Sequence, residues 1–306
     1  MRRRNFLRTS VLVSIGTAAV ARYGWVATEN TTAAQAQVFL ASGEPNNAIR
    51  KLLEAMEGVA RFVKPGMTVV VKPNIAFPNP ATWSTTTSPE VVQAVVQVCR
   101  EAGARRILIV DNPLQSDPEE NLKRSGFREA ILEDEVVQFM MIKDERKYET
   151  ITPTNTTVLR KVQVARIVSK ADCFINMPVA KSHRETSVSM GVKNLMGLIW
   201  DRKIFHEQLD LHRAIADLTT IIHPHLTIMD ATRGLLTNGP EGPGKVGSIG
   251  KIIAGTDMLA VDAVTVIQAP WNRMNSKPDE VLHLKYAAEL GGGIVDLERI
   301  VQQEIS

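Results

Sequence analysis

Cationic and amide side chains that can bind an anion recur directly after apolar segments of this sequence. The run Asp172-Cys-Phe-Ile-Asn-Met-Pro-Val-Ala leads straight into Lys181 and His183, which fall on the same side of an extended chain. A lysine ammonium attracts carboxylates and phosphates, and a histidine exchanges protons near neutral pH. The segment therefore predicts a site for a small anionic molecule with an acid–base group beside it.

In the segment MTVVVKPN, Lys72 follows the β-branched residues and precedes Pro73. Proline holds the preceding residue in an extended conformation, so the Lys72 side chain is expected to start from a fixed backbone. That suits a rigid anion ligand, although a lysine reaching from a sheet rim into water fits the same pattern. Ser88 precedes Pro89 at the start of a predicted helix, where unpaired backbone N–H groups can bind an anion. The alternative is that Ser88 is an ordinary N-cap residue.

The segment that follows His183, RETSVSMGVKNLMG, adds further anion-binding groups. Its hydroxyl-rich beginning can open a helix that carries Lys193 and Asn194, and Gly191 permits close approach of a ligand or another backbone. This segment contains neither a Gly-x-Gly-x-x-Gly motif nor a Walker-type Gly-Lys-Ser/Thr motif, so no standard nucleotide fingerprint applies to it. The segment predicts a polyanion cradle rather than a known nucleotide motif.

Aspartates and histidines supply candidates for catalysis. Asp257 fits a helix cap as well as a site residue, whereas Asp262 falls within an apolar helix and needs a partner or a place in the site. Such carboxylates hold Mg²⁺ or, when desolvated, transfer protons. The predicted catalytic residues are His183, His206, Asp230 and Asp262. The predicted ligand-binding residues are Lys72, Asn74, Ser88, Asn176, Lys181, Lys193, Asn194 and Asp257.

A metal site is a separate interpretation of the histidines. His206 and His212 are six residues apart, and His223 and His225 alternate along a strand, so the His-Glu-x-x-His spacing is absent. A transition-metal site built from His183, His206 and an aspartate remains an alternative. A divalent metal cofactor is therefore left open.

These side chains must be positioned by alternating strands and helices. Strands are predicted at 67–74, 105–112, 136–144, 171–181, 225–234 and 250–257, with a hairpin or edge strand within 156–168. Helices are predicted at 88–104, 117–126, 127–135, 187–197, 207–222, 258–269, 277–290 and 296–303.

The predicted strands lack internal alternation and are separated by helices, which indicates an α/β fold with a mainly parallel central sheet and helices on both faces. Ligands of such sheets bind beyond the carboxyl ends of the strands, where the candidate residues fall. The glycine-rich segment 235–250 predicts a lid or binding loop, with an inert surface loop as the alternative.

The N-terminal residues MRRRNFLRTSVLVSIGTAAVA resemble a twin-arginine export signal. The apolar stretch is short and polar for a membrane span, which needs about 20 apolar residues. We predict a signal peptide over 1–36 with cleavage before Gln37, export by the twin-arginine machinery to the periplasm or another extracytoplasmic site, and anchoring if the signal stays uncleaved. A basic N-terminal helix is the alternative.

Removing residues 1–36 takes away five arginines and one glutamate, which changes the net charge from +3 to −1. Nucleic acid is therefore not an expected partner. The rest, 37–306, has the size of one globular domain. Cys99 and Cys173 fit buried apolar positions, with one disulfide as an alternative, and two thiolates cannot hold a usual iron–sulfur cluster.

Five blocks in order resemble the family of domain of unknown function 362. They are VVVKPN with TSPEVVQAVV, DCFINMPVAKSH with SVSMGVKNLMGLI, AIADL, LTIMDATRG with NGPEGPG, and AGTDMLAVDAV, spread over about 67–269. The resemblance implies an α/β domain of unassigned activity, often in redox settings. Some members carry an added ferredoxin-like cluster domain, but no Cys-x-x-Cys series follows here, so a built-in cluster is not implied.

Two classes of function fit these features. The first is an exported enzyme that binds a small anion in a Lys/His/Asp-lined cleft. The second is a non-catalytic accessory or maturation protein that docks on a redox enzyme, or a carrier of a metal or cofactor. The enzyme is the favoured interpretation and the second class is the alternative; the sequence names no substrate.

Overall fold

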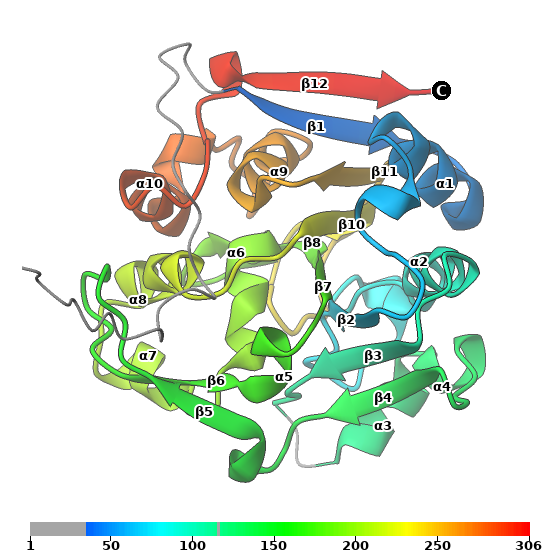
Figure 1. Cartoon of the computed structure of the whole chain (residues 1–306). Coiled ribbons are helices and arrows are strands. Elements are labelled where there is room, and N and C mark those ends of the chain that lie inside the picture. The colour runs from blue at the N-terminus through cyan, green and yellow to red at the C-terminus, as the bar shows by residue number, and fades with distance from the viewer. Residues whose placement is uncertain (1–34, 115–116) are drawn as a thin grey trace, which may run out of the picture. The chain divides into compact units, whose positions relative to one another are not determined.

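The computed structural model describes residues 35–114 and 117–306, and Gln35–Ser306 form one compact unit. Its main sheet, shown in Figure 1, confirms the predicted α/β class. Among the described strands on its central path, every neighbouring pair is parallel except the two that involve β11. The path runs β12 (Ile300–Ile305), β1 (Ala36–Ala41), β11 (Val246–Gly255), β10 (Leu226–Leu235), β7 (Cys173–Met177), β2 (Thr68–Pro73), β3 (Arg106–Asp111) and β4 (Val137–Met141).

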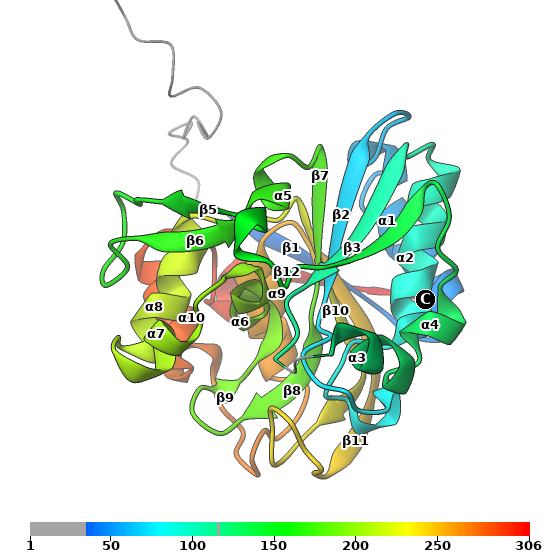
Figure 2. The same cartoon turned by 90° about the horizontal axis from the view of Figure 1, so that it is seen from below.

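Helices cover both faces of this sheet, as Figure 2 shows from below. One face packs against α1 (Pro45–Ala55), α2 (Pro89–Glu101), α3 (Pro118–Arg124) and α4 (Phe127–Ala130). The other packs against α6 (Met190–Asn194), α7 (Lys203–Glu207), α8 (Leu211–Asp217), α9 (Met258–Val266) and α10 (Leu282–Glu289). Val69 and Val71 enter the first core and Val70 the second, because successive strand residues point to opposite faces. Lys72 therefore points toward α6.

The predicted strand 171–181 is divided at Pro178 into β7 and β8 (Val179–His183). Proline has no N–H to donate to a ladder, and its carbonyl instead accepts the N–H of Asp230 at 2.9 Å. Beyond this break, β8 pairs with β10 and with the short β9 (Ser187–Val188) rather than continuing beside β2. The break takes Lys181 and His183 off the central path of the sheet, away from β2.

The prediction of a helix over 296–303 is wrong, because residues 300–305 form edge strand β12 parallel to β1. The two strands come from opposite ends of the folded unit, a pairing that no local pattern announces. Strand β1 and helix α1 were not predicted. The predicted signal residues 1–34 lie outside the described residues, and β1 begins at Ala36, one residue before the predicted cleavage point.

The glycine-rich segment is shorter than predicted. Strand β10 extends to Leu235 and β11 begins at Val246, so only residues 236–245 are irregular. The long hairpin arms reach past the sheet and place this loop, called loop 236–245 below, beside β8. Within the described ranges, no helix has the length and apolar character needed to cross a membrane.

The range 156–168, predicted as a hairpin or an edge strand, holds one short strand: β6 (Val162–Ala165) pairs antiparallel with β5 (Tyr148–Ile151), and α5 (Arg166–Ser169) follows it. The connection before β6 is held by Asp217, a fully buried residue at the end of α8. Its carboxylate accepts the N–H groups of Thr157, Val158 and Leu159 at 2.7–2.8 Å and the Thr157 hydroxyl at 2.9 Å. This one carboxylate attaches the hairpin to the helical layer.

Replacing Asp217 with Ala should lower the free energy of unfolding by about 3 kcal/mol, because the N–H groups of one buried and two half-buried residues lose their acceptor. Urea denaturation followed by circular dichroism measures this loss. Asp210→Ala is the matched control, since Asp210 caps the other end of α8 through one exposed hydrogen bond and should cost about 1 kcal/mol. Equal losses in the two variants would contradict the anchoring role.

Candidate functional site

The carboxyl ends of β2 and β3 meet at a buried ion pair between Lys72 and Asp111. The Lys72 Nζ lies 2.8 Å from the Asp111 Oδ1, and the exposed fractions of the two side chains are 1% and 2%. The ammonium also donates to the carbonyl of Pro73 at 2.6 Å. Burial lowers the pKa of Lys72, and the Asp111 carboxylate opposes that shift. Lys72 is thus already neutralised by a protein group.

Asp111 has a second task in the loop that follows β2. Its Oδ2 accepts the N–H of Ile75 at 2.6 Å, and its Oδ1 accepts the N–H of Asn112 at 2.9 Å. Gly197 packs directly on the ion pair: a Cβ there would contact the Asp111 carboxylate and lie 2.7 Å from the Lys72 Nζ. Any side chain at position 197 would separate the two charges.

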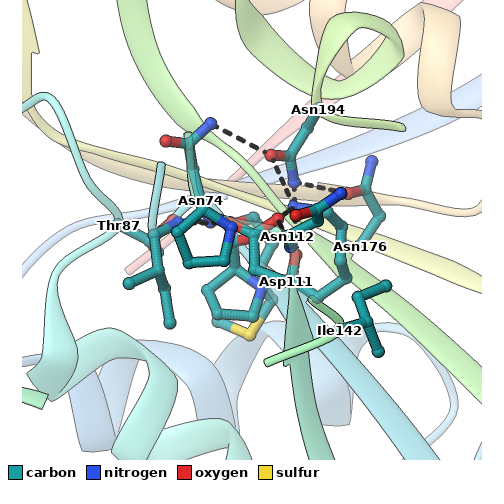
Figure 3. Close-up of polar contacts among 12 residues, drawn as sticks. Asn74, Thr87, Asp111, Asn112, Ile142, Asn176 and Asn194 are labelled. Atoms are coloured by element: carbon teal, nitrogen blue, oxygen red, sulfur yellow. Dashed lines mark hydrogen bonds and ion pairs between the residues drawn. The ribbon is translucent and has the colours of Figure 1, made fainter. Parts of the chain in front are cut away.

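Asn194 of α6 connects the ends of two neighbouring strands, β2 and β7, as Figure 3 shows. Its amide donates to the Lys72 carbonyl at 3.2 Å and to the Asn176 Oδ1 at 2.8 Å. Its oxygen accepts the Lys72 ammonium and the Asn74 amide, both at 3.1 Å. Four residues predicted as ligand-binding, Lys72, Asn74, Asn176 and Asn194, are therefore brought together, but as partners of one another.

Lys181 reaches the same network from β8. Its Nζ donates to the Asn74 Oδ1 at 3.1 Å and to the Thr85 carbonyl at 2.6 Å, and it lies 5.1 Å from the centre of the Phe77 ring. It makes no ion pair with any residue of 35–114 or 117–306. Burial, aided by the Lys193 and Lys72 charges, lowers the Lys181 pKa to about 7. Lys181 is a buried cation that the described residues do not neutralise.

Lys193 of α6 is also unpaired in the part of the chain that the structure describes. Its ammonium reaches only the sulfur of Met196, at 3.5 Å. Burial lowers the Lys193 pKa to about 8, against the attraction of Glu185. Arg202 lies within electrostatic range and donates to the Asn112 carbonyl at 2.8 Å. Lys72, Lys181 and Arg202 thus lie within electrostatic range of the one buried carboxylate of Asp111. Lys193 lies within range of Lys181 and Arg202, so the cluster has an excess of positive charge.

The predicted aspartates are occupied by backbone donors. Asp262 of α9 accepts the N–H groups of Gly191 and Val192 at 2.7 and 2.9 Å, and its burial raises the pKa to about 7. Asp257 caps α9 through the N–H of Ala260 at 3.0 Å. Asp262 therefore fixes the start of the helix that carries Lys193 and Asn194, and its catalytic role stays a prediction.

Asp230 lies at the N-terminus of α2, where it accepts the N–H of Ser88 at 2.7 Å and the Thr232 hydroxyl at 2.7 Å. Burial raises the Asp230 pKa. Ser88 is the N-cap residue, but its hydroxyl donates to Glu90 instead of accepting a helix N–H. Ser88 also lines an open hollow of about 340 Å³ with Arg233. Asp230 thus takes the place that an anion was predicted to occupy beside Ser88.

The two predicted catalytic histidines occupy different environments. His183 is buried, its Nδ1 accepts the N–H groups of Glu185 and Thr186, and burial lowers its pKa to about 2. His206 of α7 is exposed and lies 3.0 Å from the Glu185 carboxylate. Among the described residues, no group of three or more His, Cys, Asp or Glu side chains converges as metal ligands. The alternative of a metal site built from His183, His206 and an aspartate is therefore wrong for this part of the chain.

Loop 236–245 covers the Lys181 side of the network. The N–H of Gly239 donates to the Ser182 hydroxyl, and the Gly239 carbonyl accepts the N–H of Arg184 at 3.1 Å. A Cβ on Gly242 would lie 3.3 Å from the methyl group of Thr85, whose carbonyl binds Lys181. The loop therefore closes over the residues around Lys181.

Sequence reasoning left several network residues out of the predicted site. Asp111 ends the apolar run ILIVD just as Lys72 follows VVV, so the same signal could have selected it. Thr87 accepts the N–H of Asn74 at 2.8 Å and donates to the Met177 carbonyl at 2.8 Å. Arg202 comes from a turn with no pattern of its own. Its place depends entirely on tertiary packing.

Comparisons with known proteins add a family and a curated relative. The model of the family described as "Domain of unknown function (DUF362)" matches residues 69–266. The "Thylakoid-associated protein sll1697" of Synechocystis sp. is 29% identical over 226 residues, which cover 71% of this chain and 67% of that protein.

A solved structure, the lactate racemase apoprotein from Thermoanaerobacterium thermosaccharolyticum, is similar with 15% sequence identity and a TM-score of 0.44. The similarity covers 82% of this chain and 56% of that chain, so this chain spans little more than half of the racemase.

Asp111→Asn should lower the free energy of unfolding by about 3–5 kcal/mol, because it leaves the Lys72 ammonium buried without a counter-charge. Adding Lys72→Met should recover part of that loss, which urea denaturation of both single variants and the double variant measures. The control is Glu101→Gln, which breaks the exposed Arg50–Glu101 pair and should cost less than about 1 kcal/mol. Strict additivity of the two central substitutions would contradict the coupling.

Proposed function

This chain belongs to the DUF362 family, and from that premise we propose that it is an exported protein that binds a small anionic ligand beside Lys181 and Lys193. The observation that supports the proposal is the imbalance of buried charge. Lys72 has Asp111 as its counter-ion, whereas Lys181 and Lys193 have none among the described residues. Lys181 is buried and Lys193 is half-buried. An ammonium removed from water is costly unless it is paired, so we propose an anion as the missing partner.

The same two lysines favour an enzyme over a passive binding protein. A lysine with a pKa of about 7 is present in both protonation states at neutral pH, which is the condition for general acid–base work. Lys181 lies beneath loop 236–245, so we propose that ligand entry requires this loop to move. In this role Lys181 transfers the proton and Lys193 holds the anion, while the Asn74 side chain and the Thr85 carbonyl fix the direction of the Lys181 side chain by accepting its hydrogen bonds.

An accessory role is the second candidate. The network around Asn194 is closed and its predicted ligand residues bind one another, which suits a protein that holds its site shut until a partner opens it. In this accessory role the partner is a redox enzyme, and the bound anion acts as cargo or as a signal. Turnover of an anionic substrate by the isolated protein would favour the enzyme over this alternative.

Sulfate affinity should fall as the pH rises from about 6 to about 9. Lys181 and Lys193 have pKa values lowered to about 7 and about 8, so both are protonated at the low end and neutral at the high end. The loss should reach about tenfold or more, since each charged hydrogen bond to the anion disappears. Isothermal titration calorimetry with sulfate measures it, because sulfate keeps its charge over this range.

Lys181→Met should weaken sulfate binding about tenfold at pH 6 and flatten the pH profile. Lys170→Met is the matched control, because Lys170 is exposed and remote from the network. Without anion, the stability of the protein should instead rise between pH 7 and 10, where the unfolded chain binds more protons than these two lysines do. A sulfate affinity that is the same at both ends of the range would refute the anion site.

Export is proposed from the residues that precede the folded unit. Changing Arg3 and Arg4 together to Lys should leave the precursor in the cytoplasm, because twin-arginine recognition depends on both guanidinium groups. Cell fractionation and immunoblotting measure this, with Arg8→Lys as the control that should be exported normally. Normal export of the Arg3→Lys/Arg4→Lys variant would rule out this route.

A further inference from the structure

A histidine pair on the helical face has polar atoms without partners. His283 of α10 is fully buried, and neither of its ring nitrogens has a hydrogen-bond partner among the residues that the structure describes. The Nδ1 of His212 on α8 is buried and unpartnered in the same way. The two ring centroids lie 6.3 Å apart. The pair therefore presents several unsatisfied groups in one place.

Unpaired nitrogens are unusual in a protein interior, because a buried polar group without a partner costs free energy. A neutral imidazole has one N–H donor and one nitrogen acceptor. Among the described residues, the N–H of His283 has no acceptor and its other ring nitrogen has no donor. Burial lowers the pKa of His283 well below its ordinary value, and the nearby charges of Lys193 and His212 add to that shift. His283 is thus neutral and carries both kinds of unmet hydrogen bond.

Lys193 connects this pair to the proposed anion site. Helix α8 contacts both α6, which carries Lys193, and α10, which carries His283. Lys193 lowers the pKa of His212 and of His283, so its ammonium lies within electrostatic range of both rings. His212 is only partly buried, which leaves the α8 side as the approach from solvent. The rings and the ammonium therefore belong to three adjoining helices of the same layer.

The surroundings favour an anion over a metal ion. Two histidines form no group of three ligands with any other described His, Cys, Asp or Glu, and a zinc site needs at least three protein ligands. The Lys193 charge would also repel a cation, while it attracts an anion. Asp210 and Glu185 act on His212 in the opposite direction, but both are exposed, so their charges are screened more strongly by water.

We propose that His283, His212 and Lys193 form a subsite that selects an oxyanion which also carries a hydroxyl group. An anionic oxygen accepts from Lys193 and from the imidazole N–H, and the ligand's own O–H donates to the free nitrogen of His283. Such a ligand satisfies both unmet hydrogen bonds at once. This inference rests on the proposed function through Lys193, and it names the chemical class of the ligand.

Hydrogen phosphate and sulfate are a matched pair of probes for this subsite. At about pH 8 both are tetrahedral dianions, but only hydrogen phosphate carries an O–H. The full chain should bind hydrogen phosphate about tenfold more tightly than sulfate in calorimetric titrations. In His283→Phe that preference should fall to about one, because the ring keeps its volume and loses its nitrogens.

The histidine ring resonances of the unmodified protein give a second measurement that does not depend on a variant. In nitrogen-15 spectra, hydrogen phosphate should shift the His283 ring nitrogens and sulfate should shift them much less. His212→Gln, at the partly exposed position, should weaken hydrogen phosphate binding several-fold and sulfate binding less.

Each of the other outcomes contradicts the subsite, the proposed function or both. Equal binding of the two anions, or an unchanged preference in His283→Phe, rejects the subsite; the proposed function still stands if sulfate binding depends on Lys181. Absence of binding by either anion rejects both. A shift of the His283 nitrogens with Zn²⁺ and not with hydrogen phosphate replaces the anion subsite with a metal site.

Discussion

The buried pair of Lys72 and Asp111 is the constraint on which the rest of the site depends. An ammonium without water must have a carboxylate and hydrogen-bond acceptors around it, and here they come from separate parts of the chain. Asp111 is the last residue of β3, Pro73 ends β2, and Asn194 belongs to α6. Strand register, the turn after β2 and the place of α6 must therefore all be correct before Lys72 can be buried. The glycine at 197 follows from the same requirement, because the pair leaves no room for a side chain.

Helix α6 has only five residues, too few for a helix that is stable by itself. Asp262 compensates by accepting two of its first N–H groups, and Asp262 in turn lies on α9, which packs against β10 and β11. The order of dependence is thus sheet, α9, α6 and then Asn194. An aspartate in an apolar helix has a structural explanation here, and the same carboxylate decides where Lys193 stands relative to His212 and His283.

The sequence was most informative where a residue's position follows from a strand. Lys72, Asn74, Asn176 and Lys181 were predicted together because parallel strands end at one edge of a sheet, and the structure places them in one network. Prediction failed where placement depends on contacts between distant segments. Examples are the pairing of β1 with β12, the division of one strand at Pro178, and the positions of Arg202 and His283. His206 is a different case: its residue type suggested catalysis, and among the described residues its side chain contacts the exposed Glu185, so its role stays a prediction.

The cations of the site differ in whether the chain supplies a counter-ion for them. Where a positive charge is structural, the chain supplies its counter-ion, as Asp111 does for Lys72. Lys181 and Lys193 are held by neutral groups alone, an amide, a carbonyl, an aromatic ring and a thioether, in the part of the chain described. Neutral acceptors orient an ammonium without neutralising it, so these two lysines keep their direction while their charge remains available. A site that only needed filling would be satisfied by apolar side chains at both positions, and the fold would avoid the desolvation cost. The proposed function explains these retained, oriented and unpaired charges as half of an interaction whose other half is an anion.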